Sequence, residues 1–135
     1  MTTNSNYPPR GPRSRLFVAV AATVVAIEAV VYVVLAVLAG ADISADTVAT
    51  GIGIALFLAL YGLAQLFAAW NLLNWRAWAR GPLLFTQLVQ LGLAWGLRDS
   101  KEQWLAILMA VSAAIALACL IAPAATRALL DDDAV

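Results

Sequence analysis

The sequence contains no histidine and only one cysteine, Cys119, among its 135 residues. Histidine is the commonest general base and transition-metal ligand and the usual pH switch, so its absence removes the ordinary routes to those activities. A single thiol forms no internal disulfide and no metal site by itself. Cys119 lies within an apolar segment, where we expect it to be a small packing residue.

The motifs of several common enzyme classes are missing as well. The sequence has no glycine-rich phosphate-binding loop, no HExxH or CxxC motif and no nucleophile elbow. We therefore expect no catalytic residue, no metal ion and no cofactor. The chain is predicted not to be an enzyme.

Charged residues are scarce, at 12% of the chain, whereas soluble domains carry about 25%. Apolar residues make up 64%, and the mean hydropathy is +0.89. A soluble domain of this length cannot bury so much apolar surface, so the composition predicts a polytopic membrane protein with one membrane domain. The net charge is zero, which gives no reason to expect a nucleic-acid partner.

Four apolar runs are separated by short polar segments, and we expect each run to form a transmembrane helix. The predicted spans are residues 16–39, 48–73, 82–97 and 103–122, within a membrane domain of residues 16–122. Loops of about 5–8 residues cannot cross the bilayer, so neighbouring spans run antiparallel. The predicted fold class is all-α, an antiparallel bundle of four transmembrane helices. We expect residues 1–15 to be a disordered basic tail and residues 123–135 a short tail.

Basic residues near the predicted helix ends are distributed unevenly. One side of the predicted bundle holds Arg10, Arg13, Arg15, Arg76, Arg80 and Arg127, and the other holds Arg98 and Lys101. Lys and Arg accumulate on the cytoplasmic side of membrane proteins, so both termini are predicted to be cytoplasmic.

Two interpretations are open for Arg76 and Arg80, which are one helical turn apart beside tryptophans. They are candidate contacts for anionic lipid headgroups. They also contribute to the charge asymmetry that sets topology.

The most costly residue for a membrane helix is Glu28, in the middle of the first apolar run. A charge near the bilayer midplane costs roughly 2.5–3.5 kcal/mol on insertion scales. Counting about 1.5 Å per residue from the helix ends places polar residues of all four spans near this depth. The candidate intramembrane site comprises Glu28, Tyr61, Gln65, Gln87, Gln90 and Ser112. Each of these groups needs a partner in hydrocarbon, so we expect them to point inward.

Two hypotheses account for this polar layer. In the first, Glu28 is a proton or cation site, because isolated intramembrane carboxylates often mark ion pathways. In the second, Glu28 is a neutral acid, hydrogen-bonded to glutamine, that fixes the register of the helices. No cation is predicted at its depth and burial disfavours the charged form. We therefore expect Glu28 to be protonated at neutral pH under either hypothesis.

Small residues form stripes on two of the predicted spans. Gly92 and Gly96 make a GxxxG pattern in the third span, a pattern that lets helix backbones approach closely. Such stripes serve contacts within a bundle or between copies, and the sequence leaves both uses open.

Several motifs from Trp75 onward carry a resemblance to known proteins. They are Arg76-Ala77-Trp78-Ala79-Arg80-Gly81-Pro82, Thr86-Gln87, Ala94-Trp95 and the segment from Pro123 to Leu129. The WAR-x-P…TQ spacing resembles small, uncharacterised four-helix integral membrane proteins of actinobacteria. The resemblance implies a multi-pass protein of the bacterial plasma membrane, and it carries over no catalytic or binding residue.

Size, helix number and a glutamate in the first helix are also similar to the small multidrug-resistance transporters. The chain departs from that family in its basic N-terminal tail, in an arginine bias that fixes one orientation and in the residues around Glu28. The similarity rests on architecture alone.

The expected function is that of a non-enzymatic membrane protein that acts by association within the bilayer, as an accessory or assembly subunit or as a homo-oligomer. The partners expected are the lipid bilayer and either another membrane protein or a second copy. The alternative is a proton-coupled small-molecule transporter or channel that uses Glu28, with Gln87 and Gln90 lining the path. The sequence identifies no substrate.

Overall fold

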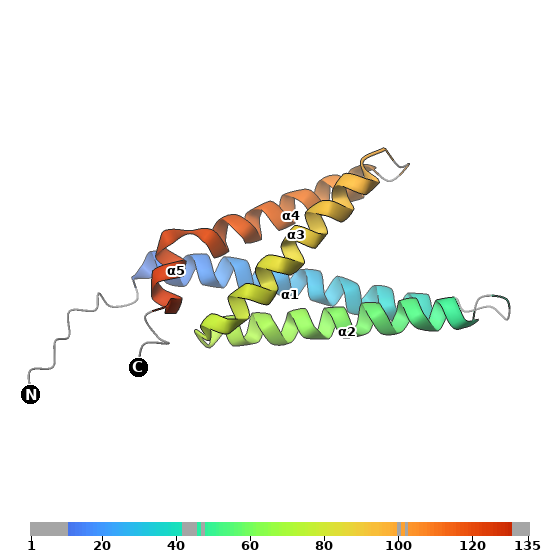
Figure 1. Cartoon of the computed structure of the whole chain (residues 1–135), viewed down its shortest axis with the longest axis horizontal. Coiled ribbons are helices and arrows are strands. Elements are labelled where there is room, and N and C mark those ends of the chain that lie inside the picture. The colour runs from blue at the N-terminus through green and yellow to red at the C-terminus, as the bar shows by residue number, and fades with distance from the viewer. Residues whose placement is uncertain (1–10, 42–45, 47, 100, 102, 131–135) are drawn as a thin grey trace, which may run out of the picture.

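The computed structural model describes residues 11–41, 46, 48–99, 101 and 103–130. Its elements are α1 (Pro12–Ala41), α2 (Val48–Leu73), the short 3-10 helix η1 (Ala77–Ala79), α3 (Arg80–Leu97), α4 (Gln103–Ile121) and α5 (Pro123–Leu130), arranged as Figure 1 shows. Every regular element in these residues is a helix, which confirms the all-α prediction there.

Three of the helices, α1, α2 and α4, are long enough and apolar enough to cross a membrane. The 18-residue α3 is not among them. Its sequence carries Arg80, Thr86, Gln87 and Gln90 among its apolar residues, and these polar groups lower its hydropathy. The helix predicted at residues 82–97 therefore forms, starting at Arg80, but its composition alone does not mark it as a span.

The helix bounds differ from the expected ones at both ends of the chain. Helix α1 begins at Pro12, where proline suits the first helical turn, and so includes part of the expected tail 1–15. Residues 123–130, expected to be tail, form α5, with Ala125 and Leu129 buried. Residues 1–10 and 131–135, the remainder of the two expected tails, lie outside the described residues.

Helix α2 ends in a left-handed turn at Trp75, whose φ is 61°. The Trp75 N–H donates to the Leu72 carbonyl at 3.0 Å, and the Arg76 N–H donates to the Asn71 carbonyl at 3.0 Å. These two bonds form the Schellman pattern that usually places glycine at this position. Trp75 instead packs its ring against the buried cluster of apolar side chains.

Helices α1 and α2 pack side by side and run in opposite directions. Gly40 of α1 lies near Ala55 of α2, and Gly62 of α2 lies against Ala29 of α1. A Cβ at Gly62 would come within 2.8 Å of the Ala29 carbonyl oxygen, so this contact admits no larger residue without a shift. The second pair, α3 and α4, also packs together.

The two helix pairs meet at one end of the molecule and diverge toward the other (Figure 1). We call the end that holds the start of α1, η1 and α5 the terminal half, and the end that holds the end of α1, the start of α2 and the end of α3 the loop half. Large buried side chains gather in the terminal half: Val18, Val25, Leu72, Leu83, Leu120 and Leu129. In the loop half the buried apolar residues are the alanines Ala36, Ala94 and Ala106. No residue of α2 before Gly62 is buried.

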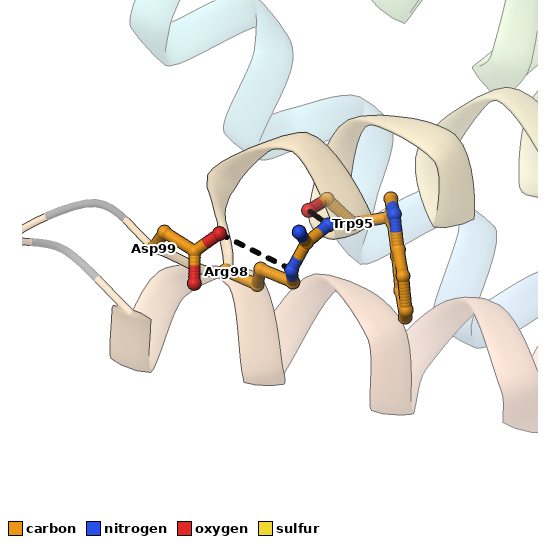
Figure 2. A network of polar contacts seen from close by, with 3 residues as sticks. All are labelled: Trp95, Arg98 and Asp99. Atoms are coloured by element: carbon orange, nitrogen blue, oxygen red, sulfur yellow. Dashed lines mark hydrogen bonds and ion pairs between the residues drawn. The ribbon is translucent and has the colours of Figure 1, made fainter.

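The loop end of α3 is stabilised by the side chain of Arg98, the residue that follows the helix (Figure 2). The Arg98 guanidinium lies 4.4 Å from the centre of the Trp95 ring and donates through Nη1 to the Trp95 carbonyl at 3.3 Å. Its Nε also pairs with Asp99 Oδ2 at 3.2 Å. The Trp95 carbonyl near the end of α3 thus accepts both the backbone N–H of Arg98, at 3.4 Å, and its guanidinium.

Candidate functional site

Glu28 is a buried residue, and only 9% of it is exposed. It occupies the middle of α1, on the face that also buries Val25 and Ala29. A buried carboxyl group in apolar surroundings is stable only when its oxygens are hydrogen-bonded. The structure supplies those bonds from α3.

Both carboxyl oxygens of Glu28 accept a hydrogen bond from a glutamine amide. Gln87 Nε2 donates to Oε2 at 2.8 Å, and Gln90 Nε2 donates to Oε1 at 2.9 Å. The exposed fractions of Gln87 and Gln90 are 0% and 2%. The two residues are three apart on α3, so they lie on one face of that helix and both bind the carboxyl group. This contact joins one helix pair to the other.

Gln90 extends the network to a third helix. Its Nε2 also lies 2.9 Å from Ser112 Oγ and 3.2 Å from the Met109 carbonyl oxygen, both on α4. Its Oε1 accepts a hydrogen bond from the Tyr32 hydroxyl of α1 at 3.2 Å. One amide side chain therefore links α1, α3 and α4.

Two tyrosines lie on the loop side of this network. The rings of Tyr32 and Tyr61 meet edge to face at 5.0 Å between centroids, and Tyr61 stacks on Phe57 at 5.8 Å. The Tyr61 hydroxyl donates to the Thr86 carbonyl of α3 at 3.5 Å. Tyr61 thereby joins α2 to α3.

Some polar atoms of the layer have no hydrogen-bond partner. Both amide atoms of Gln65, which is 1% exposed, are buried and unpaired, and so is Oε1 of Gln87. Most buried polar groups in folded proteins are paired, so these atoms are exceptions that need a physical cause.

The network fits Glu28 in both of its protonation states. An ionised carboxylate accepts a hydrogen bond from both amides, Nε2 of Gln87 and Nε2 of Gln90, in the observed geometry. A neutral Glu28 donates its hydroxyl to Gln87 Oε1 when that amide is turned over, because oxygen and nitrogen of an amide exchange places on reversal. In both states a neutral amide, and not a cation, is the partner of each oxygen.

The structure brings together four of the six residues expected at this depth, namely Glu28, Gln87, Gln90 and Ser112. Tyr61 lies beside the network, and Gln65 is buried at its level without a partner. Sequence reasoning missed Tyr32. The signal for it was present, because Tyr32 is four residues after Glu28 and so lies on the same face of α1.

The candidate lipid contacts Arg76 and Arg80 lie at the terminal end of the molecule and differ in their surroundings. Arg76 is exposed, whereas Arg80 is half-buried and donates through Nε to the Leu120 carbonyl at 3.0 Å. Leu120 lies in the last turn of α4, whose final carbonyls have no helical partner. Arg80 therefore caps α4 from the start of α3.

The chemistry available at this site is hydrogen bonding and proton exchange. Within the described residues, no group of three or more His, Cys, Asp or Glu is placed to hold a metal ion. Glu28 is the single carboxyl group of the network, and its neighbours are amides and hydroxyls.

In comparisons with known proteins, no family model, no curated protein and no solved structure matches the chain.

Proposed function

We propose that the protein is a non-enzymatic integral membrane protein of the bacterial plasma membrane that acts by associating with a second copy or with another membrane protein. In this proposal α1, α2, α3 and α4 all span the bilayer and both termini are cytoplasmic. The observation that carries it is the sparse packing of the loop half, where the buried apolar side chains of the described residues are alanines and α2 buries nothing before Gly62.

The polar layer supports α3 as the fourth span. Gln87 and Gln90 lower the hydropathy of α3, but their amides are directed at Glu28 and are buried, so lipid does not meet them. A polar residue that is hydrogen-bonded inside a helix bundle is compatible with a span. The exposed face of α3 is apolar and includes Phe85, Leu88 and Leu93.

This topology is tested by placing single cysteines at the two ends of α3, in a Cys119→Ala background. Asn74 and Asp99 are both exposed and lie before and after the helix. A membrane-impermeant thiol reagent added to intact cells should label Asp99→Cys and leave Asn74→Cys unlabelled until the membrane is opened. Labelling of both positions in intact cells would contradict the four-span topology.

The glycines of α3 offer a surface for association. A Cβ at Gly92 or Gly96 would meet nothing within 4 Å in this chain, unlike one at Gly62. Small residues at a free helix face let another helix approach closely, which is how many membrane helices pair. In this chain the GxxxG pattern is thus not used for contacts between its own helices.

Association is tested by counting subunits in lipid bilayers through single-molecule photobleaching and by crosslinking in native membranes from a photoreactive residue at Leu93. We expect complexes in the native membrane that Gly92→Ile weakens, whereas the matched change Gly81→Ile at the terminal end of α3, where a Cβ also meets nothing, leaves them unchanged. A protein that stays monomeric at every density and crosslinks only to lipid would refute the proposal.

A second candidate, a proton-coupled carrier or channel, is favoured by one observation. The carboxyl group of Glu28 is buried in the middle of α1, with the half-buried Tyr32 and Tyr61 on its loop side. Under this alternative Glu28→Gln abolishes proton-linked flux in vesicles, because an amide cannot carry the proton. Under the association proposal Glu28→Gln leaves both folding and association in place.

A further inference from the structure

The unpaired amide groups of Gln65 and Gln87 share one region of the protein. Gly62 lies against Ala29, Tyr32 and Val33 of α1. Because α1 and α2 run in opposite directions, Gln65, three residues beyond Gly62, lies level with about residues 26–30 of α1. Glu28 falls within that range, and its Oε2 is 2.8 Å from Gln87 Nε2. Tyr61, four residues before Gln65 on the same face of α2, donates to the carbonyl of Thr86, the neighbour of Gln87. The unpaired amide atoms of Gln65 and Gln87 therefore lie along the contact between α2 and α3, near the level of Glu28.

The kind of atoms left unpaired restricts what binds them. They comprise one donor group, Nε2 of Gln65, and two acceptors, Oε1 of Gln65 and Oε1 of Gln87. A cation satisfies the two oxygens and leaves the N–H₂ group unpaired, whereas an anion does the reverse. Water both donates and accepts, so it is the simplest ligand that satisfies the mixed set.

This conclusion does not depend on how the amides are oriented. Turning over Gln65 exchanges its donor and its acceptor and leaves one of each. Turning over Gln87, as a protonated Glu28 favours, replaces an unpaired acceptor by an unpaired donor. Donors and acceptors remain mixed in every case, so the argument holds for both protonation states of Glu28.

We propose that water molecules are bound in the interior between α2 and α3, held by the side chains of Gln65 and Gln87. One water accepts from Gln65 Nε2 and donates to Gln87 Oε1, and a second donates to Gln65 Oε1, so that each unpaired atom gains a partner. Through Gln87 this water belongs to the hydrogen-bond network of Glu28. The inference is independent of the proposed function.

The most direct test is water-edited solid-state NMR of the full chain in lipid bilayers, which follows magnetisation from water to side-chain amides. Gln90 is the internal control, because its Nε2 is already directed at Glu28 and Ser112. We expect the Gln65 amide to receive magnetisation from water earlier than the Gln90 amide. A Gln65 signal no faster than that of Gln90, or a direct contact between the Gln65 and Gln87 amides, would overturn the proposal.

A matched pair of substitutions gives an independent readout. Gln65→Met keeps the length of the side chain and removes its hydrogen-bonding groups, and Leu66→Met is the control at an exposed neighbour. If water is bound, Gln65→Met lowers the folding equilibrium constant by about fivefold to tenfold, the usual size for one lost hydrogen bond. If the region is dry, the substitution removes unpaired polar groups and is neutral or stabilising, which would contradict the proposal.

Discussion

The terminal half and the loop half of this molecule are built from the same helices but are packed in different ways. The terminal half buries large side chains from α1, α2, α3, α4 and α5, including Leu72, Leu83 and Leu120. The loop half holds each helix pair together through alanine and glycine, and the pairs diverge there. No hydrophobic effect drives membrane helices together, because lipid tails are as apolar as the side chains. Close packing and hydrogen bonding therefore decide which helices contact one another.

The Glu28 network lies at the boundary between the two halves. Its hydrogen bonds from Gln87 and Gln90 fix α1 to α3 at the level where apolar packing between the pairs ends. A buried polar contact of this kind sets register and partner choice more than it adds stability. The network thus marks the level at which large buried side chains give way to buried alanines.

The largest expected effect on this comparison comes from removing a core side chain. Leu83→Ala in the terminal half empties a fully buried position and should destabilise the protein by about 2–5 kcal/mol. Leu93→Ala, on the same helix in the loop half and 52% exposed, should cost less than about 1 kcal/mol. Unfolding equilibria in bilayers, measured by steric trapping, check both values. Equal costs would remove the distinction between the halves.

The next effect concerns the boundary. Glu28→Leu leaves the Gln87 and Gln90 amides without their acceptor, which should cost about 2–4 kcal/mol because buried unpaired groups retain their desolvation penalty. Glu28→Gln should cost less than half of this, since an amide both accepts from Gln90 and donates to Gln87. The same unfolding assay measures both variants. A stable Glu28→Leu protein would show that the network is not needed to join the helix pairs.

A smaller effect is expected from a methyl group at the contact between α1 and α2. Gly62→Ala places a Cβ 2.8 Å from the Ala29 carbonyl oxygen and should cost about 1–3 kcal/mol through the shift it forces. Gly92→Ala, where a Cβ meets nothing, should be neutral or slightly stabilising in the monomer because alanine favours helix. Thermal unfolding in detergent compares the two. The idea fails if Gly92→Ala is the more harmful change.

The smallest effect is expected at the loop end of α3. Arg98→Ala removes the stacking on Trp95 and the pair with Asp99, whose side chains are exposed to solvent. Exposed ion pairs and cation–π contacts contribute about 0–1 kcal/mol each, so the loss should be close to the error of an unfolding measurement. A cost above about 2 kcal/mol would mean that this end is more tightly packed than the structure shows.

Much of the helical organisation follows from the lengths of the apolar runs, and some of it does not. The runs predict α1, α2 and α4 well, because hydropathy over about 20 residues is a strong signal. Helix α5 was not expected, because Pro123 marks the end of α4 but also suits the first turn of a new helix. The left-handed turn at Trp75 was not predicted either, because the position holds no glycine, which is the usual sequence signal for such a backbone.

Within the candidate site, depth along each helix is enough to group Glu28 with Gln87, Gln90 and Ser112. Depth does not say which side chains reach one another, so Tyr61 was expected in the layer and Tyr32, which bonds to Gln90, was not. The sequence also did not predict the divergence of the helix pairs. It depends on how side chains fit between helices, and hydropathy measures only their preference for lipid.

One measurement tests the difference between the halves most directly: the distances between spin labels on α1 and α4, which belong to different helix pairs, measured in the terminal half and in the loop half. In a Cys119→Ala background, Leu16→Cys with Ile121→Cys reports the terminal half, and Leu38→Cys with Ile107→Cys reports the loop half; all four residues are exposed. In lipid discs that hold one copy, double electron–electron resonance should give a short, narrow distribution for the first pair and a longer, broader one for the second. Two equally short and narrow distributions would contradict this account.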